Sequence, residues 1–329
     1  MEESILLLIL SEKDVNQSLS MSEAIDVMEQ AFITYAKQDF IMPERIFSKV
    51  KEEDTLLLMP CYVDDCIGLK VATSFPSNRG SDEPVTQGVI MINDRETGKP
   101  LSMMNGTLLT AIKTAAVSGV AMRYFKKEAT TIGLIGTGQQ GLYQLLAAIE
   151  STKVEKIYVY NRTPEKIASF HEDFSKLLNR SIEVIAINDV KQLVQKSEVI
   201  ITATTSLSPV IPNDTSLYKG KLVIGVGSFK ENMRELPEEI FKSAPYYVID
   251  SEDGKNECGD IIDPIQNGWI EEDRVLLLSD LLIGNKKYVP TSEEPIVFKT
   301  VSMALFDALI GNYVYKKAQK KNVGVAVKI

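Results

Sequence analysis

The sequence predicts an α/β protein in which a Rossmann-type, doubly wound parallel sheet is accompanied by an α+β region. Three observations lead to this prediction. The chain has 329 residues, which suits two domains of ordinary size. From residue 130 onward, short β-branched runs alternate with helical patterns, as they do in parallel sheets. A glycine-rich loop lies between the first of these strands and its following helix, where nucleotide-binding folds hold phosphate groups.

The parallel sheet is expected in the second half of the chain. Its strands are short apolar runs, and amphipathic helical patterns separate them. The expected strands are 131–135, 156–160, 182–187, 198–202, 221–225 and 246–250, with helices at 140–149 and 165–178.

The first part of the chain has a different pattern, in which helices and strands are punctuated by Gly and Pro. Helices are expected at 20–35 and 107–125, and one more long helix is expected at 296–320. The expected strands are 5–10, 45–50, 56–59, 67–72 and 89–93.

Charge and composition argue against several classes of partner. The net charge is −9, whereas nucleic-acid binding needs clustered Lys and Arg. The apolar run at residues 5–10 is too short to span a bilayer, and Met1-Glu-Glu-Ser lacks the positive start of a signal peptide. We therefore expect a cytoplasmic protein with no nucleic-acid partner and no membrane segment.

The few cysteines and histidines restrict the chemistry. The three cysteines are odd in number and lie away from any zinc-binding spacing, and the one histidine, His171, lies beside acidic residues in an expected helix. No metal site is expected, and a Ser-His-Asp triad would lack its histidine unless His171 serves. Proton transfer therefore falls to Lys, Asp, Glu, Tyr or water.

The glycine loop is the strongest local signal. In Gly136-Thr-Gly-Gln-Gln-Gly141, Gly136 would allow the tight turn and Gly138 the close approach of backbone N–H groups to a pyrophosphate. Gly141 would allow close packing of helix on strand. The motif alone occurs by chance, but the strand before it and the helix after it favour a dinucleotide site over a plain turn.

The end of the second expected strand bears on the choice of dinucleotide. NAD enzymes usually place an acidic residue there for the ribose hydroxyl, but this chain has Asn161-Arg162-Thr163. A guanidinium beside two neutral donors suits a 2′-phosphate. NADP(H) is the preferred cofactor and NAD(H) remains open, because Arg162 can also be a solvated turn residue.

Three cations in the first part of the chain lie among apolar positions. They are Arg45, Lys70 and Lys113. If they converged, they would bind a carboxylate, and a desolvated lysine can act as an acid or base. From spacing alone, each is equally explained as a cation at the rim of the core.

Several motifs spread along nearly the whole chain are distinctive in combination. They are Met42-Pro-Glu-Arg45, Gly68-Leu-Lys70 with Phe75-Pro76, Asp94-Arg-Glu-Thr-Gly98-Lys-Pro-Leu101, Thr110-Ala-Ile-Lys-Thr-Ala-Ala116, Gly136-Thr-Gly-Gln-Gln140, Thr202-Ala-Thr-Thr-Ser206, Gly227-Ser-Phe with Met233-Arg-Glu-Leu236, and Glu257-Cys-Gly-Asp260. Together they resemble the ornithine cyclodeaminase and mu-crystallin family, which also includes archaeal-type alanine dehydrogenases and reductases of cyclic imino acids.

The resemblance implies two domains and a homodimer. Residues 1–125 with 300–329 would form a discontinuous substrate-binding and dimerisation domain, and 126–299 the dinucleotide-binding domain. Arg45, Lys70 and Lys113 would line the substrate site as catalytic residues. Arg45 and Lys113 would hold the substrate carboxylate, and Lys70 would bind the carboxylate or imine region and could deliver a proton.

The resemblance also implies the cofactor contacts. Besides the loop glycines Gly136, Gly138 and Gly141, they are Thr86, Thr114, Gln139, Gln140, Asn161, Arg162, Thr163, Thr204, Val226, Ser228 and Ser302.

Three departures from the family pattern stand out. Lys113 replaces the usual Arg, which exchanges a bidentate fork for a point charge. The cyclodeaminases have a catalytic Asp in the loop where this chain has Gly227-Ser-Phe-Lys230, so cyclodeamination is in doubt. Ser302 replaces a common Gly near the nicotinamide.

The missing Asp, together with the cofactor signal Asn161-Arg162-Thr163, resembles the ketimine reductase branch of the family. The expected reaction is NAD(P)H-dependent reduction of a cyclic 2-imino acid, of the Δ1-pyrroline-2-carboxylate or Δ1-piperideine-2-carboxylate type, to the cyclic amino acid. An amino-acid dehydrogenase acting on alanine or forming an opine, an ornithine cyclodeaminase-like enzyme, and a non-catalytic NADPH-dependent ligand-binding protein like mu-crystallin remain as alternatives. In each case the partner is a small carboxylate.

Overall fold

The computed structural model describes residues 6–78, 80–178 and 180–329. The chain divides into two compact units. The first unit comprises the residues up to Lys113 together with Met303–Ile329, and the second unit is Thr114–Ser302. The sequence placed these boundaries near 125 and 300. The first boundary differs because helix α3 (Gly106–Lys126) continues unbroken through it, and a boundary within a helix leaves no mark in the sequence.

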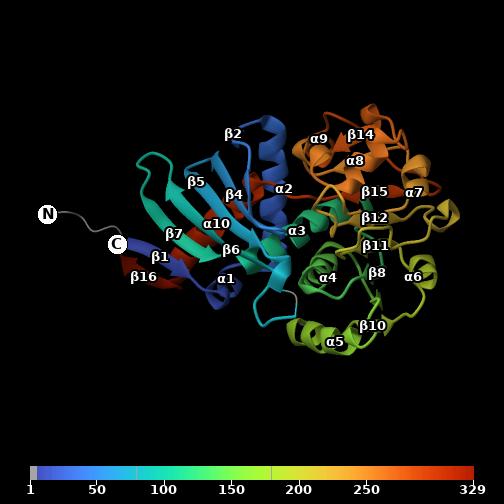
Figure 1. Cartoon of the computed structure of the whole chain (residues 1–329), viewed down its shortest axis with the longest axis horizontal. Coiled ribbons are helices and arrows are strands. Elements are labelled where there is room, and N and C mark those ends of the chain that lie inside the picture. Colours follow the sequence, from blue (N-terminus) through green and yellow to red (C-terminus); the bar gives the residue numbers. More distant parts are fainter. Residues whose placement is uncertain (1–5, 79, 179) are drawn as a thin grey trace. The chain divides into compact units, whose positions relative to one another are not determined.

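A parallel sheet organises the second unit, with strand order β10-β9-β8-β11-β12-β15-β13-β14 (Figure 1). Every neighbouring pair is parallel, which confirms the expected Rossmann-type sheet. The strands are β8 (Thr131–Ile135), β9 (Lys156–Tyr160), β10 (Glu183–Ala186), β11 (Val199–Thr202), β12 (Leu222–Gly225), β13 (Tyr247–Ile249), β14 (Val275–Leu277) and β15 (Ile296–Lys299).

Strand β15 corrects one expectation from the sequence. The long helix expected at 296–320 begins only at Ala304, and Ile296–Lys299 instead forms a buried strand between β12 and β13. A short apolar run fits a buried strand as well as a buried helix, so its pairing partners decide between the two.

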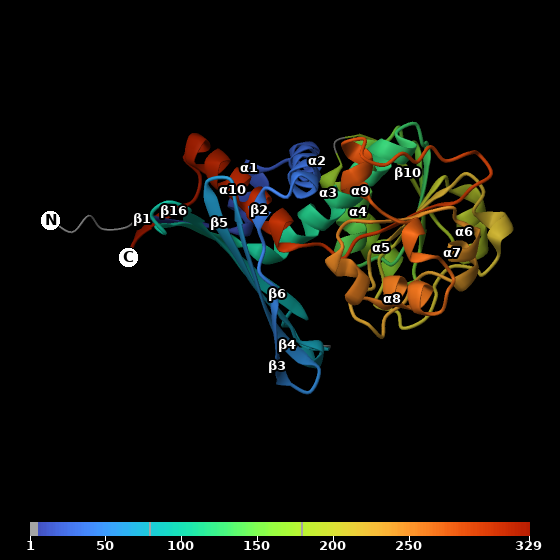
Figure 2. The same cartoon turned by 90° about the horizontal axis from the view of Figure 1, so that it is seen from above.

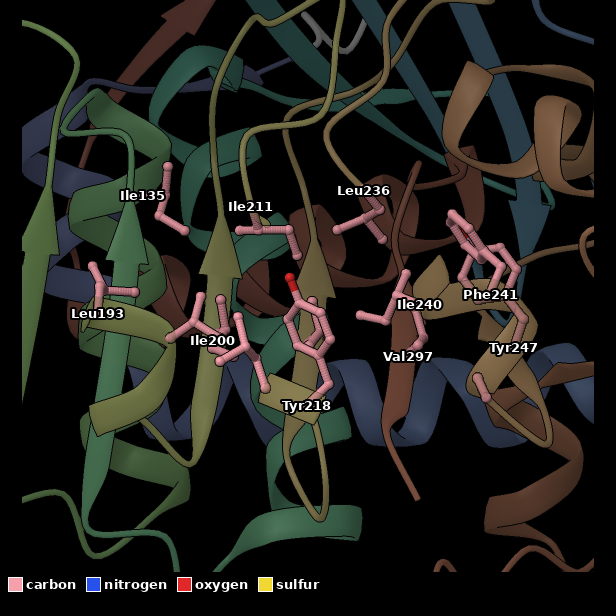
Figure 3. Close-up of a cluster of buried hydrophobic side chains, with 14 of the residues drawn as sticks. Ile135, Leu193, Ile200, Ile211, Tyr218, Leu236, Ile240, Phe241, Tyr247 and Val297 are labelled. Carbon is pink, nitrogen blue, oxygen red and sulfur yellow. The ribbon is translucent and has the colours of Figure 1, made fainter. Parts of the chain in front are cut away.

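Helices and a large apolar cluster cover the parallel sheet. Figure 3 shows part of this cluster, in which Tyr218, Phe241 and Tyr247 are fully or almost fully buried beside strand residues such as Ile200 and Val297. The helices of the second unit are α4 (Gln139–Ser151), α5 (Lys166–Leu177), α6 (Val190–Lys196), α7 (Glu238–Ser243), α8 (Gly259–Gln266) and α9 (Leu278–Leu282).

The first unit is an α+β structure built on a mainly antiparallel sheet, as expected. The strand order is β16-β1-β7-β6-β5-β4-β2, and β3 pairs with β4. Only the pairing of β1 with β7 is parallel among the described strands of this sheet. The strands are β1 (Leu6–Leu10), β2 (Phe40–Ile41), β3 (Ile46–Lys51), β4 (Asp54–Val63), β5 (Cys66–Ser74), β6 (Thr86–Asp94), β7 (Pro100–Asn105) and β16 (Val325–Lys328).

Among the described residues, the α-helices that lie entirely in the first unit are α1 (Glu12–Ser18), α2 (Met21–Lys37) and α10 (Ala304–Lys321), and the start of α3 also belongs to this unit. Capping boxes start α1 at Ser11 and α2 at Ser20, which satisfies backbone donors at each helix start. Helix α10 packs against β4, β5 and β6 and against α2 (Figure 1). The C-terminal segment thus supplies a helix and the edge strand β16 to a sheet begun by the N-terminal segment.

No helix in residues 6–78, 80–178 or 180–329 is long and apolar enough to cross a membrane.

Candidate active site

The glycine loop of the second unit joins β8 to α4. Gly136 has a φ of +103°, and a Cβ there would lie 2.5 Å from the Ala203 carbonyl oxygen. At Gly141 a Cβ would lie 2.2 Å from the Gly136 carbonyl oxygen. Both positions therefore exclude any side chain.

The middle glycine of the loop has a different surrounding. A Cβ at Gly138 would meet no heavy atom of the described residues within 4 Å. Gly138 is also the N-cap of α4 and supplies no side-chain hydrogen bond to it. The first N–H groups of α4 and its positive dipole end are therefore available to an anion, and the loop fits a pyrophosphate.

Polar groups at the end of β9 lie next to the glycine loop. Asn161 Nδ2 donates to Thr137 Oγ1 of the loop, and Asn161 Oδ1 accepts from the backbone N–H of Thr163 at 2.9 Å. The Asn161 side chain is thus held by both segments, while Arg162 is exposed. This arrangement leaves the guanidinium of Arg162 accessible to a ligand on the sheet's carboxyl edge.

A buried carboxylate fixes the loops that follow β11 and β12. Glu235 is fully buried. Its Oε1 accepts from the backbone N–H and the hydroxyl of Thr204 at 2.6 and 2.7 Å, and its Oε2 accepts from Gly227 N and Thr202 Oγ1 at 2.6 and 3.0 Å. Charged acceptors form the stronger kind of hydrogen bond, so Glu235 ties two strand ends together.

The carboxylate of Asp260 in turn holds the segment around Glu235. Asp260 Oδ1 accepts from the N–H groups of Glu235 and Leu236 at 2.9 and 3.0 Å. Burial raises the pKa of Asp260 to about 6, although the nearby Lys299 cation opposes this shift. The charged form of Asp260 is therefore destabilised by its surroundings.

Two further buried charges fix the ends of β12 and β15. Lys299 Nζ donates to the carbonyl oxygens of Ser228 and Gly225 at 2.7 and 3.2 Å. Asp250 accepts from Thr300 Oγ1 at 2.6 Å and from Ser302 N at 2.8 Å. Together these groups give the loops at the carboxyl edge of the sheet a defined shape.

Ser302 lies in the left-handed region with a φ of +69°. This region favours glycine because a Cβ crowds the backbone there. The conformation gives a physical reason for the glycine common at this position in the family that the motifs resemble. The effect of the serine, which the sequence left open, is therefore backbone strain.

The other expected cofactor residues occupy varied surroundings. Ser228 is buried, and its hydroxyl donates to the Met233 carbonyl at 2.6 Å. Val226 is buried, Gln139 is exposed, and Thr114 and Gln140 are half-buried. Thr86, in the first unit, is exposed at the start of β6.

Two of the three expected cations lie beside one carboxylate. Lys113 Nζ donates to Asp307 Oδ1 at 2.7 Å, and Lys70 Nζ lies 3.6 Å from the same oxygen. Lys113 is completely buried, whereas Lys70 is 7% exposed. Burial lowers the pKa of Lys113 to about 8; Asp307 opposes this shift, and Lys70 and Arg45 add to it. Lys70 and Lys113 therefore share Asp307 as a counter-ion, and Arg45 lies close enough to act on Lys113.

These features match a known protein family along almost the entire chain. The model of the ornithine cyclodeaminase/mu-crystallin family matches residues 7–322. The chain belongs to this family. The resemblance found in the sequence motifs is thereby confirmed.

Several family relatives are similar over their full length. A Δ1-pyrroline-2-carboxylate reductase of Bacillus cereus is 31% identical over 326 residues, which cover 97% of this chain and 98% of the relative. The structure of Thermococcus litoralis Δ1-pyrroline-2-carboxylate reductase in complex with NADH and L-proline has 34% identity, a TM-score of 0.91, and coverage of 98% and 100%. An archaeal alanine dehydrogenase dimer with bound NAD has 27% identity, a TM-score of 0.90, and coverage of 99% and 100%.

Sequence reasoning missed the buried acidic residues of this family member. Glu235 and Asp260 lie in motifs that supported the resemblance, but those motifs did not reveal what the carboxylates bind. Asp307 lies in the apolar run Ala304-Leu-Phe-Asp-Ala-Leu. A lone acid in such a run is rarely buried without a partner, and that signal could have drawn attention to it.

Proposed function

We propose that this chain is an NAD(P)H-dependent reductase that converts a cyclic 2-imino acid into the corresponding cyclic amino acid. Substrates of the Δ1-pyrroline-2-carboxylate and Δ1-piperideine-2-carboxylate type would give proline and pipecolate. The observation that carries the proposal is the grouping of Lys70 and Lys113 around Asp307, with Arg45 close enough to affect the pKa of Lys113. The 31–34% identity to reductases of this substrate class supports it.

The charge of this group suits a substrate that contains a carboxylate. Three cations and one carboxylate leave a net positive charge, which attracts the anionic substrate. Arg45 is half-buried and Lys70 is slightly exposed, so these two would contact the carboxylate or the imine nitrogen. Lys113 is fully buried and bound to Asp307, and its expected direct contact with the carboxylate remains a prediction.

The reduction requires a proton donor, and we propose that this donor is Lys70. Reduction of a neutral imine adds one hydride to carbon and one proton to nitrogen. A nicotinamide dinucleotide, bound by the glycine loop and the neighbouring strand ends, would supply the hydride. Lys70 would supply the proton to the nitrogen and recover one from solvent, because its ammonium group is less buried than that of Lys113 and an Arg guanidinium does not release a proton.

Steady-state assays with purified protein test the proposal. We expect both cyclic imino acids to be reduced, and Lys70→Ala to abolish turnover while leaving dinucleotide affinity unchanged. Lys316→Ala is a matched control, because Lys316 forms an exposed ion pair with Asp65 of the same unit. Bound cofactor without reduction of any cyclic imino acid would refute the proposal, and Lys70→Ala with normal turnover would refute the role of Lys70.

A second candidate function is that of an amino-acid dehydrogenase. The likeness to the archaeal alanine dehydrogenase, with a TM-score of 0.90, supports this alternative. Reductive amination of pyruvate consumes free ammonia, whereas reduction of a cyclic imine does not. Turnover with pyruvate that requires ammonia, combined with no turnover of cyclic imines, would favour the dehydrogenase.

We further propose that NADPH is preferred over NADH. Exposed Arg162, beside Asn161 and Thr163, supports this preference because a guanidinium stabilises a 2′-phosphate. Arg162→Ala should weaken NADPH binding by about tenfold, which corresponds to one lost charged hydrogen bond, and leave NADH binding unchanged. Equal losses for both cofactors, or tighter NADH binding by the unaltered protein, would contradict this preference.

We also propose that the protein forms a homodimer through the first unit. Strand β3 is exposed along its entire length, including Ile46, Phe47 and Val50. In Figure 2 the ends of β3, β4 and β6 extend beyond the helices of the first unit. An exposed apolar edge strand is a surface that proteins usually cover. Phe47→Glu should shift sedimentation from dimer to monomer, and a monomeric unaltered protein would refute the proposal.

A further inference from the structure

A buried carboxylate joins two cations that come from distant parts of the chain. Asp307 is 1% exposed. Its Oδ1 lies 2.7 Å from the Nζ of Lys113 in α3 and 3.6 Å from the Nζ of Lys70 in β5. One oxygen atom therefore sets the positions of two ammonium groups.

The packing of α10 on the sheet determines where this carboxylate lies. Ala308 lies directly against Gly68 of β5, where a Cβ would be only 2.5 Å from the Ala308 Cβ. Lys70 follows two residues later on the same face of the strand. On the other side of Asp307, Phe306 packs edge-on against Phe32 of α2, with ring centroids 5.0 Å apart. The carboxylate is thus held between two fixed neighbours.

The second oxygen of Asp307 makes no stabilising contact in this position. Oδ2 is buried and has no hydrogen-bond partner among the described residues. A buried carboxylate oxygen without a partner costs stability, and an ion pair in the core is often no better than apolar side chains of the same size. The arrangement is therefore poorly explained by stability and better explained by what Asp307 does to the lysines.

We propose that Asp307 is a positioning residue of the substrate site, which fixes the Lys113 ammonium and orients the Lys70 ammonium beside it. The inference rests on the proposed function, in which Lys70 contacts the substrate. Asp307 and Lys113 are more deeply buried than Lys70 and act on the reaction through it.

Charged and titratable groups from three elements lie near Asp307. They are Lys70 from β5, Lys113 from α3 and the thiol of Cys61 from β4. Burial raises the pKa of Cys61 to about 12, so this thiol stays neutral. Burial lowers the pKa of Lys113 to about 8, and the Asp307 carboxylate opposes this shift, whereas Lys70 and Arg45 add to it.

This balance predicts the effect of two substitutions on Lys113. Asp307→Asn removes the anion that opposes the effect of burial, so the pKa of Lys113 should fall further. Asp307→Glu keeps the anion and should restore the pKa of Lys113. A carboxylate that only supported the fold would not shift the titration of Lys113.

The test follows the titration of Lys113 in two ways. The first is the free energy of unfolding from urea titrations as a function of pH, which should rise as the pH rises through the lowered pKa of Lys113, and the second is the pH profile of kcat/KM for the cyclic imine. Asp307→Asn should shift this rise and the alkaline limb of the activity profile to lower pH, Lys113→Met should remove both, and Asp307→Glu should restore both. Asp65→Asn, which removes a carboxylate that contacts Lys316 and Asn312 of α10, is the control and should shift neither curve.

The outcomes separate the two proposals. Identical stability and activity profiles in the unaltered protein and Asp307→Asn would overturn the role of Asp307. If Asp307→Asn does not fold, Lys113→Met and the double variant Lys113→Met/Asp307→Asn decide, because the double variant leaves no buried charge unpaired; a kcat/KM in the double variant that is no lower than in Lys113→Met would overturn the role. A protein that reduces no imino acid would overturn the proposed function, but its stability profiles would still show whether Asp307 acts on Lys113.

Discussion

Replacement of Glu235 by Gln perturbs a fully buried carboxylate of the second unit that accepts four hydrogen bonds. Each carboxylate oxygen accepts from one backbone N–H and one threonine hydroxyl. The amide of Gln presents an NH₂ group to one of these donor pairs. The hydroxyl can rotate to accept, but the backbone N–H cannot, so one buried donor loses its partner.

The expected loss follows from these contacts. An unpaired buried N–H costs about 1–3 kcal/mol, and the remaining bonds weaken when the acceptor loses its charge. Relief of the buried charge offsets part of this loss. We therefore expect Glu235→Gln to lower the free energy of unfolding by about 3 kcal/mol, and to weaken dinucleotide binding because Thr204 and Gly227 shift.

Glu198, which directly precedes β11 in the same unit, provides a matched control. Its Oε2 also accepts four hydrogen bonds, from the N–H groups and hydroxyls of Thr130 and Thr131 at 2.7–3.1 Å. Glu198 is exposed, so water can replace a lost partner and Glu198→Gln should cost less than about 1 kcal/mol. Urea titrations measure both variants, and fluorescence titration with NADPH measures binding. Equal losses for the two variants would refute the reasoning from burial.

Three further predictions concern other features of the structure. Burial raises the pKa of Asp260 to about 6 on folding, so its contribution to stability is complete below pH 4 and is lost as the pH rises through 6. The free energy of unfolding from urea titrations should therefore fall by about 3 kcal/mol between pH 4 and pH 7, and Asp260→Asn should remove this fall. An unchanged fall in the variant would contradict the reasoning. Ser302→Gly should leave the melting temperature equal or higher and Ser302→Val should lower it, because only glycine adopts a φ of +69° without strain; a more stable valine variant would exclude this explanation. Gly68→Ala should destabilise the first unit by about 1–3 kcal/mol and lower turnover, because the new methyl group would meet Ala308 and force α10 to move together with Asp307. Full activity of this variant would show that the close contact between Gly68 and Ala308 is not needed.

The elements best predicted from the sequence were those with strong local patterns. Strands β8, β9, β11 and β12 lie where the apolar runs were expected, and α4 follows the glycine loop. Strand β14 was missed because three residues give no measurable period, and β15 was mistaken for helix. In both cases the local pattern was too short to choose between two buried structures.

The charged groups of the candidate site were predicted unevenly. Arg45, Lys70 and Lys113 were singled out because cations among apolar residues are conspicuous, and the family resemblance gave them a role. Asp307, the partner of Lys70 and Lys113, was not singled out, because it lies 194 residues from Lys113 along the chain. No pattern within one segment indicates which distant charge will lie beside it.

The sequence by itself determined the parallel sheet, the glycine loop and the family. The sheet and the loop follow from patterns of residues that are close together along the chain, and the family follows from motifs that can be read directly in the sequence. Only the tertiary structure decided which charges meet. Asp307 reaches Lys70 because Gly68 lets α10 approach β5, and Glu235 reaches Thr204 and Gly227 because two parallel strands end side by side. Burial then decides the effect of these pairs, since a carboxylate shielded from water holds its donors far more tightly than an exposed one.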